Sequence, residues 1–265
     1  MKRAPAPSEV TVGREAARVE DVVHRYRARS ALNGVSFELT QGVTALIGVN
    51  GAGKSTLMSC LSGARRPTSG QVTIAGLNPY HLRERKRALP LVAAMPQTAR
   101  FPGGMTALEV VEYLTWMRGV PGREARRRAT EALERVLLGD RASTKVKHLS
   151  GGMVRRLTLA QAIAAEPAVL LLDEPSTGLD PEQRRAMVEL IARLDAELNT
   201  TVLLSSHVME DVVDVAGRVL VLEDGRLVFD GTVADLTARA PDGTPAARAA
   251  EAGFLSVLSQ SRVGA

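Results

Sequence analysis

The stretch GVNGAGKS at residues 48–55 constrains the fold of this chain more than any other part of its sequence. It follows the apolar run VTALI and precedes the run STLMSCL, which has helical spacing and ends before Gly63. A glycine-rich loop that enters from a strand and leaves into a helix is the pattern G-x-x-x-x-G-K-[ST], which binds phosphate groups. We therefore expect a strand, a phosphate-binding loop and a helix in succession here.

The residue types in this loop suit a nucleotide. Gly48, Gly51 and Gly53 let backbone N–H groups curl around phosphate oxygens. Lys54 is expected to reach the β- and γ-phosphates, and the Ser55 hydroxyl is expected to bind Mg²⁺. The helix N-terminus adds a partial positive charge at the same place. The loop residues predicted to bind the nucleotide are Gly48, Asn50, Gly51, Ala52, Gly53, Lys54, Ser55 and Thr56.

A second motif, VLLLDEP, supplies the carboxylates that such a site needs. Its apolar run predicts a central parallel strand that ends in Asp173, and the carboxyl end of that strand lies at the same sheet edge as the phosphate loop. Asp173 is expected to hold the water shell of the metal. Glu174, one residue on, is placed to polarise a water for attack on the γ-phosphate.

Strands and helices alternate along most of the chain. We predict strands at 17–23, 35–39, 43–48, 70–76, 168–173 and 200–206, turns at 33–34 and 41–42, and a hairpin at 218–231 that turns at Asp224-Gly225. We predict helices at 55–63, 106–120, 123–138, 181–197, 207–216 and 252–260. In the helix at 106–120, Leu108, Val111, Leu114 and Trp116 or Met117 fall near one face. The alternation implies an α/β core with a mostly parallel sheet, interrupted by a helical insertion.

Composition narrows the class of protein. The chain is 45% apolar and 24% charged, as in ordinary globular proteins, and its apolar runs are far shorter than the roughly 20 residues of a membrane helix. The net charge of +5 comes mainly from arginine, with clusters at 83–87 and 123–128. Aromatic residues make up only 3% of the chain and no stacking motif accompanies the clusters, so solvated helix faces are favoured over a nucleic-acid groove.

The N-terminus and the cysteine content favour a cytoplasmic protein. Residues 1–16 are polar and rich in proline and alanine, without an apolar core, which is typical of a flexible leader and not of an export signal. The single cysteine, Cys60, has no internal disulfide partner and suits a reducing compartment. We expect it to be a small buried apolar side chain.

The segment HLSGGMVRR at 148–156 indicates a family. Together with the phosphate loop and VLLLDEP, the sequence LSGG at 149–152 resembles the nucleotide-binding subunits of ATP-binding cassette (ABC) transporters, from about residue 18 to residue 238. The family usually has Gln after LSGG, where this chain has Met153. The resemblance implies a P-loop NTPase (RecA-like) core, an N-terminal antiparallel β subdomain and an inserted helical subdomain, with ATP and Mg²⁺ as cofactors.

The resemblance also implies roles for single residues. Tyr26 resembles the aromatic residue that stacks on adenine, and Gln97 the loop glutamine that senses Mg²⁺ and joins the core to the helical subdomain. Asp180 resembles the residue that couples two sites across a dimer, and is also a predicted helix N-cap. His207 resembles the switch histidine that contacts the γ-phosphate. The predicted catalytic residues are Glu174, His207 and Gln97, and the predicted metal-binding residues are Ser55, Gln97 and Asp173.

Family members divide into parts that map onto this chain. The expected parts are a leader (1–16), an ABC ATPase domain (17–240) with a core (17–97 and 167–240) and a helical subdomain (98–166), and a short tail (241–265). In the family two cassettes pack head to tail, and the Ser-Gly-Gly turn of one covers the γ-phosphate held by the other. The residues expected to act on the partner's nucleotide are Ser150, Gly151, Gly152 and Met153.

The expected partners are a membrane permease subunit and a second cassette, in a homodimer or a mixed pair. The chain would then be peripheral on the inner face of the cell membrane. The segment at 104–121 and the tail resemble cassettes of the export branch. The alternatives are a soluble ABC ATPase that acts on nucleic acid or ribosomes, and an unrelated P-loop NTPase such as a kinase, against which LSGG and His207 argue.

Overall fold

The computed structural model describes residues 15–27, 29–198 and 200–263. The predicted leader at 1–16 lies almost wholly outside the described residues. Strand β1 begins at Glu15, two residues before the predicted start of the folded domain at 17. No helix in the described ranges is long and apolar enough to cross a membrane.

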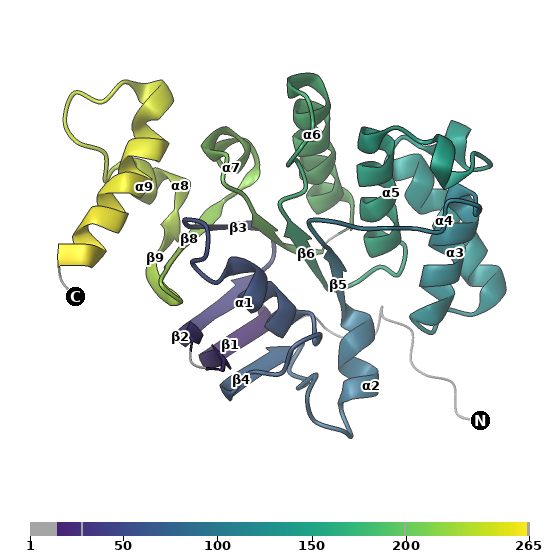
Figure 1. The fold of residues 1–265 in the computed structure, drawn as a ribbon, viewed down its shortest axis with the longest axis horizontal. Helices are drawn as coiled ribbons and strands as arrows, with labels where there is room; N and C mark the ends of the chain where they lie inside the picture. The colour runs from purple at the N-terminus through teal and green to yellow at the C-terminus, as the bar shows by residue number, and fades with distance from the viewer. Residues whose placement is uncertain (1–14, 28, 199, 264–265) are drawn as a thin grey trace.

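The centre of the fold is a six-stranded sheet in the order β5-β6-β7-β3-β8-β9 (Figure 1). Its strands are β5 (Val92–Met95), β6 (Val169–Asp173), β7 (Thr201–Ser205), β3 (Val43–Ile47), β8 (Arg218–Glu223) and β9 (Arg226–Thr232). All neighbours are parallel except the hairpin of β8 and β9, whose turn residues Asp224 and Gly225 both have positive φ. The mostly parallel sheet and the hairpin are confirmed, whereas β5 was not predicted.

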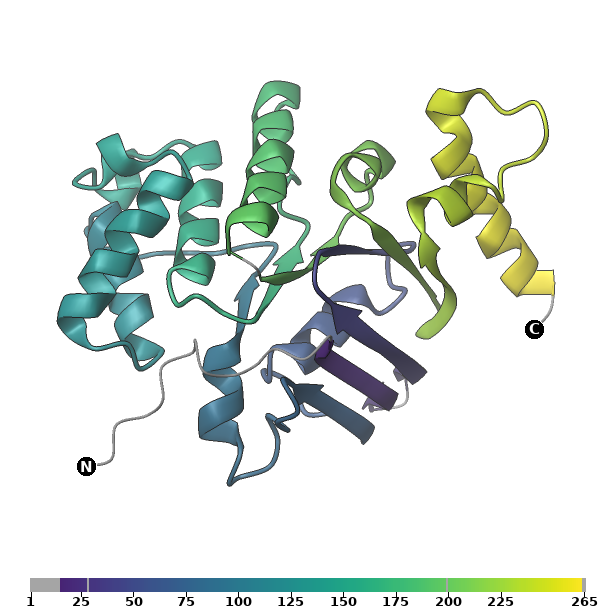
Figure 2. The same cartoon turned by 180° about the vertical axis from the view of Figure 1, so that it is seen from behind.

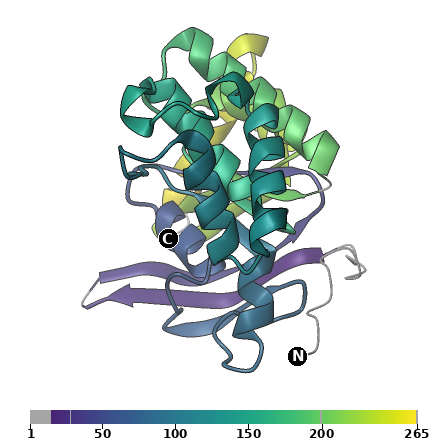
Figure 3. The same cartoon turned by 90° about the vertical axis from the view of Figure 1, so that its right-hand side faces the viewer.

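A separate antiparallel sheet in the order β2-β1-β4 lies beside the central one (Figure 3). Its strands are β1 (Glu15–Tyr26), β2 (Arg29–Thr40) and β4 (Ser69–Ile74). The predicted turn at 33–34 is wrong, because β2 runs through it. The register passes from Val22 opposite Val35 to Val23 opposite Asn33, so Gly34, with φ 77°, forms a β-bulge within the strand.

Helix α1 (Lys54–Leu61) packs between the two sheets, and it buries Cys60 and Leu61 against both. Successive residues of β3 point to opposite faces: Leu46 faces α1, and Ala45 and Ile47 face the other side. That other side is covered by helices α5 (Gly151–Ile163), α6 (Pro181–Leu198) and α7 (Met209–Val215) (Figure 2). Strand β3 is therefore packed on both faces, and the phosphate loop follows directly after it.

The helical insertion consists of α3 (Ala107–Met117), α4 (Gly122–Arg135) and α5, which pack on one another. Helix α3 begins with a capping box, in which Thr106 and Glu109 bond each other's backbone N–H groups. The predicted apolar face is wrong in part: Trp116 and Met117 are 55% and 61% exposed, because the core face of α3 is formed by Ala107, Val110, Val111 and Thr115. Leu108 and Leu114 are partly buried and pack against the core as predicted, whereas Trp116 and Met117 face solvent.

The arginine clusters lie on helix surfaces, as expected. Helix α2 (Arg85–Ala88) carries part of the first cluster. On α4, the second cluster is paired with acidic neighbours, since Arg127 and Arg128 both bond Glu124, at 2.6 and 2.7 Å. This pairing within one helix is typical of a solvated face.

The C-terminal part of the described chain is more ordered than the sequence suggested. Helix α8 (Val233–Thr237) is followed by α9 (Ala246–Val263), an 18-residue helix where a short one at 252–260 was predicted. A Cβ on Gly253 would collide with the backbone carbonyl of Leu236, so the two helices are in close contact at that glycine. The longer helix is stabilised by this packing, which local sequence does not reveal.

Candidate active site

The phosphate loop between β3 and α1 is supported from behind by backbone of other strands. A Cβ on Gly48 would collide with the carbonyl of Leu222 on β8. Gly53 has φ 109°, and a Cβ there would approach the carbonyl of Ala31 on β2 within 2.5 Å. Both positions therefore require glycine, and the loop is held by the central sheet on one side and the antiparallel sheet on the other.

Lys54 lies inside the loop. Its Nζ donates hydrogen bonds to the carbonyl oxygens of Gly48 at 2.7 Å and Val49 at 3.2 Å, and the residue is only 7% exposed. Burial lowers the pKa of the Lys54 ammonium group, and the negative charges of Glu174 and Asp173 partly oppose this. The loop thus holds a positive charge next to two carboxylates, as a site for an anion and a metal ion requires.

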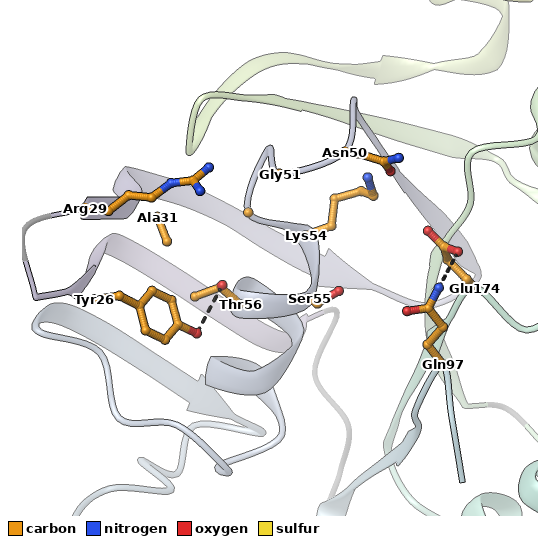
Figure 4. A pocket seen from close by; sticks show the side chains of 11 residues that line it. Tyr26, Arg29, Ala31, Asn50, Gly51, Lys54, Ser55, Thr56, Gln97 and Glu174 are labelled. Carbon is orange, nitrogen blue, oxygen red and sulfur yellow. Dashed lines mark hydrogen bonds between the residues drawn. The ribbon is translucent and has the colours of Figure 1, made fainter.

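A cavity of about 460 Å³ opens in front of the loop (Figure 4). This volume is in the range of small-molecule sites. It is lined by Tyr26, Arg29, Ala31, Asn50, Gly51, Gly53, Lys54, Ser55, Thr56, Gln97 and Glu174. Two of the predicted nucleotide-binding residues, Gly48 and Ala52, do not line the cavity. Ala52 belongs to the loop, but its side chain is buried in the core.

Tyr26 stands at the far end of this cavity, at the end of β1. Its hydroxyl lies 3.3 Å from Oγ1 of Thr56 on α1, which ties the ring to the helix that follows the phosphate loop. The Arg65 guanidinium lies 4.8 Å from the ring centroid, and His24 contacts the ring edge-on. The ring is thus anchored beside the phosphate loop, where stacking on a base is geometrically possible.

Asp173 and Ser205 end adjacent parallel strands at the sheet edge that carries the phosphate loop. Oδ1 of Asp173 accepts a hydrogen bond of 2.6 Å from the Ser205 hydroxyl. The carboxylate also raises the pKa of Lys54 through its charge, so it lies within electrostatic reach of the loop. The structure places Asp173 at this sheet edge, and its role in holding the water shell of the metal stays a prediction.

Two predicted residues, Gln97 and His207, contact the carboxylate of a third, Glu174. Oε2 of Glu174 accepts hydrogen bonds from Nε2 of Gln97 at 3.0 Å and from Oγ1 of Thr177 at 2.9 Å. Nδ1 of His207 lies 3.4 Å from the same oxygen. Since Gln97 follows β5, Glu174 follows β6 and His207 follows β7, the parallel order of these strands brings them together.

The donor set fits Mg²⁺ but is no closed metal cage. The described residues contain no group of three or more His, Cys, Asp or Glu side chains that could hold a metal ion. Ser55 offers a hydroxyl, Asp173 a carboxylate, and Gln97 an amide oxygen, which lies on the Ser55 side of that residue in Figure 4. Mg²⁺ characteristically binds through one or two such oxygens together with substrate phosphates and water.

The LSGG turn lies outside this cavity. Ser150 is the N-cap of α5, and its Oγ accepts a hydrogen bond of 3.3 Å from the backbone N–H of Met153, so the hydroxyl proton stays free to donate. The Met153 side chain packs against the core, and a Cβ on Gly152 would meet the side chain of Gln183. No residue from 149–153 lines the cavity at the phosphate loop of the same chain.

Asp180 directly precedes α6, and Gln183 of that helix lies against Gly152 of the LSGG turn. Its Oδ1 accepts a hydrogen bond of 2.9 Å from the backbone N–H of Gln183, and its carbonyl accepts one of 2.8 Å from Arg184. The predicted N-cap is therefore confirmed. The coupling role of Asp180 in a dimer stays a prediction.

Several residues around the site were missed in the sequence. Arg29 and Ala31 line the cavity because Arg29 is the β-ladder partner of Tyr26. The run of β-branched residues before Tyr26 predicts a strand, and a second strand that follows it closely can pair with it as a hairpin. That pairing could have placed Arg29 beside Tyr26. Thr177 and Ser205 hold the two carboxylates, and nothing in their local sequence marks them as partners.

The fold and this site define a class of protein. A central parallel sheet, a glycine-lysine phosphate loop after β3 and a carboxylate at the end of the strand two places away in the sheet order make the chain a P-loop NTPase. The family model described as ABC transporter matches residues 32–177, which is more than half of the chain. The chain belongs to the ABC transporter family, whose ATP-binding cassettes are ATPases.

Two relatives illustrate the similarity. "Methionine import ATP-binding protein MetN" of Streptomyces griseus is 39% identical over 223 residues, which cover 81% of this chain and 62% of that protein. "Linearmycin resistance ATP-binding protein LnrL" of Bacillus subtilis is 35% identical over 222 residues, which cover 83% of this chain and 70% of that protein. This chain therefore spans less than two thirds of the length of the methionine import protein.

Solved structures share the fold. The structure of cbiO1 from Clostridium perfringens, described as part of the ABC transporter complex cbiONQ, has a TM-score of 0.77 and 26% identity, and the match covers 85% of this chain and 92% of that one. A dimeric post-hydrolysis state of the ATP-binding cassette MJ0796 bound to ADP and Pi has a TM-score of 0.73 and 26% identity, with 82% and 98% covered.

Proposed function

We propose that this chain binds ATP with Mg²⁺ in the cavity at the phosphate loop and hydrolyses it. The observation that carries the proposal is the contact of Gln97 and His207 with Glu174. Gln97 and Glu174 line the same cavity as Lys54 of the phosphate loop. A carboxylate held by two hydrogen bonds beside a phosphate site is arranged to orient a water.

Each group then has a distinct task. Lys54 and the backbone N–H groups of the loop bind the phosphates and neutralise their charge, and Tyr26 stacks on the base. Glu174 accepts a proton from the attacking water, while Gln97 and Thr177 hold its carboxylate in place. We propose that His207, whose Nδ1 lies 3.4 Å from Oε2 of Glu174, contacts the γ-phosphate. When bound through Ser55, Asp173 and Gln97, Mg²⁺ would neutralise charge that develops on the phosphate oxygens.

We also propose that two chains pack head to tail and that the Ser150 turn of one binds the γ-phosphate held by the other. Two features support this. The Ser150 turn lies outside the cavity of its own chain and offers a hydroxyl donor at a helix N-terminus, which suits an anion. A related cassette, MJ0796, is described as dimeric with ADP and Pi bound.

The proposed biological role is to power a separate membrane permease from the cytoplasmic face of the membrane. The relatives support a transport role, since they are described as import or resistance ATP-binding proteins, and cbiO1 as part of a transporter complex. The export direction expected from the sequence is not supported by these relatives, because MetN is named for import. We further propose the division into a core, a helical subdomain at 98–166 and a tail at 241–265, supported by the mutual packing of α3, α4 and α5.

The direct test is phosphate release by the purified chain. ATP with Mg²⁺ is expected to yield phosphate, and chelation of Mg²⁺ is expected to stop the reaction. Size-exclusion chromatography with ATP and without it tests the dimer. Retention by solubilised membranes of the source cell, compared with retention by double-stranded DNA at moderate salt, separates the permease role from the alternative of a nucleic-acid ATPase. A chain that releases no phosphate from ATP would contradict the proposal.

A further inference from the structure

Arg155 on α5 makes an unusual set of contacts. It is only 9% exposed, and its guanidinium group donates four hydrogen bonds, every one to a backbone carbonyl. Nε bonds Pro175 at 3.1 Å, Nη1 bonds Pro96 at 3.2 Å and also Gln97, and Nη2 bonds Glu174. These four acceptors belong to two loops that are separated by nearly eighty residues in the chain. One side chain therefore joins the loop of Gln97 to the loop of Glu174.

This arrangement requires arginine. A guanidinium group presents several N–H donors in a rigid planar fork, whereas a lysine ammonium is a single point on a flexible stem. Arg155 forms no ion pair within the described part of the chain; burial lowers its pKa, and the charges of Asp173 and Glu174 partly offset that effect. The carbonyl dipoles of the two loops thus take the place of a carboxylate partner.

The backbone that Arg155 holds is strained at Glu174. Glu174 has φ 48°, in the left-handed region that residues other than glycine rarely adopt. Such a conformation persists when the surroundings fix it from several sides. Here Ser205 accepts the Glu174 N–H at 2.9 Å, and Arg155 donates to its carbonyl. The backbone N–H and C=O groups of Glu174 are therefore both hydrogen-bonded, and the Glu174 side chain contacts Gln97 and His207.

The same helix carries the Ser150 turn at its N-terminus. Arg155 lies five residues after Ser150, within the second turn of α5, so a displacement of the helix end moves both groups together. Ser150 does not line the cavity of its own chain, while Arg155 bonds the Gln97 and Glu174 loops that do. Helix α5 is in this way a rigid connection between a surface turn and the hydrolysis site behind it.

We propose that Arg155 is a positioning residue that fixes Gln97 and Glu174 of its own chain in response to what binds at Ser150. This inference rests on the proposed function, in which Ser150 contacts the nucleotide of a second chain. Contact at Ser150 sets the position of α5, and Arg155 passes that position to the two loops through their carbonyl groups. Hydrolysis at one site of the dimer then depends on occupancy of the other.

Arg155→Lys tests the inference, because it keeps the positive charge and the length but loses the fork. Arg156→Lys, on the next, half-buried residue of α5, is the matched control. We expect Arg155→Lys to bind ATP with a Kd within about twofold of wild type and to lose roughly 10- to 100-fold in kcat, since small displacements of reacting groups have effects of that size. Arg156→Lys is expected to keep wild-type kcat.

Double mutants separate positioning from a merely structural role. If Arg155 acts through Gln97 and Ser150, the kcat losses of Arg155→Lys with Gln97→Ala, and of Arg155→Lys with Ser150→Ala, will be smaller than the product of the single losses. Multiplicative losses, or wild-type kcat in Arg155→Lys, would overturn the inference. Thermal unfolding of each variant identifies loss of fold, and Arg155→Gln serves as a second variant should Arg155→Lys unfold.

The failure of this inference is distinguishable from that of the proposed function. If the wild-type chain and Arg156→Lys hydrolyse ATP and Arg155→Lys does so equally well, only the assignment of Arg155 is wrong. If the wild-type chain releases no phosphate, the proposed function is wrong and the inference falls with it. If the wild-type chain hydrolyses ATP at the same rate per chain at concentrations where it is a monomer, hydrolysis does not depend on contact at Ser150. That result would contradict the proposed link from Ser150 to Arg155 but not the proposed hydrolysis.

Discussion

Nε2 of Gln97 donates a hydrogen bond of 3.0 Å to Oε2 of Glu174, 77 residues further along the chain. The bond joins the end of β5 to the end of β6, which are neighbours in the central sheet. A displacement of the Gln97 loop would therefore also move or release the Glu174 carboxylate, which we propose as the base.

Glu174→Gln should abolish most hydrolysis without preventing binding. The amide has nearly the same shape, so ATP should still bind, but it does not accept the proton of the attacking water. We expect kcat to fall at least about 100-fold. Phosphate release and ATP binding are measured side by side, with Glu210→Gln, an exposed glutamate of α7, as the control. Wild-type turnover in Glu174→Gln would show that another group is the base.

Lys54→Ala should weaken ATP binding. The substitution removes a buried ammonium group, whose charged hydrogen bonds to phosphate are worth about 1.5–3 kcal/mol, or roughly a 10- to 100-fold increase in Kd. Equilibrium binding of a fluorescent ATP analogue measures the change. Lys86→Ala, on the exposed surface of α2, should leave Kd unchanged. An equal Kd in both variants would contradict the placement of phosphates at the loop.

Ser150→Arg should block pairing and turnover together. Ser150 is exposed and caps α5, so Ser150→Arg loses about 1 kcal/mol of capping energy and the variant should still fold. The arginine side chain would occupy the space next to a partner's nucleotide. We expect ATP to be bound as in wild type, with no ATP-induced dimer in size-exclusion chromatography or light scattering. An ATP-induced dimer with normal turnover in Ser150→Arg would contradict the head-to-tail proposal.

Cys60 should be inert to thiol reagents in the folded protein. It is fully buried on α1, and burial raises its pKa from 9.0 to about 11. Because the folded thiol holds its proton more tightly than the unfolded one, stability from this group is present below pH 9 and is lost as the pH rises from 9 towards 11. Labelling by N-ethylmaleimide at pH 8 should be slow in buffer and fast in denaturant. Fast labelling of the native chain would contradict the burial.

Arg262→Ala should reduce stability. Glu223 at the end of β8 is only 5% exposed, and Nε of Arg262 on α9 donates to its Oε1 at 2.7 Å. The substitution leaves a buried carboxylate with Ser261 as its remaining partner on α9. Since Arg262 itself is mostly exposed, we expect a loss of about 1 kcal/mol in the free energy of unfolding. Denaturant unfolding measures it, against Arg248→Ala, an exposed arginine of the same helix, which should be neutral.

Local patterns predicted the parts of the site that lie close together in the chain. The phosphate loop, the strand that ends in Asp173, the N-cap at Asp180 and the hairpin turn at Asp224-Gly225 each depend on a few consecutive residues. Their physical causes are also local: glycine tolerates the loop backbone, a short carboxylate caps a helix, and positive φ suits the Asp-Gly turn.

Other features depended on contacts between distant segments. Strand β5 has the unremarkable sequence VAAM, and it is a strand because it pairs with β6. Gly34 forms a bulge and not a turn, because β2 continues to pair with β1 on both sides of it. Trp116 is exposed because α3 packs on α4 and α5 through the face that carries Val111 and Thr115, and Trp116 lies outside that face.

The amino-acid sequence by itself determined that this chain is a P-loop protein of the ABC transporter family, since its motifs carry their own backbone chemistry. Only the tertiary structure decided which groups act on one another. Thr177 and Gln97 hold the Glu174 carboxylate, and Arg155 holds the two loops, because parallel strands end at one sheet edge and a helix from the insertion packs against it. Such pairings follow from the order of strands in space, which no local run of residues encodes.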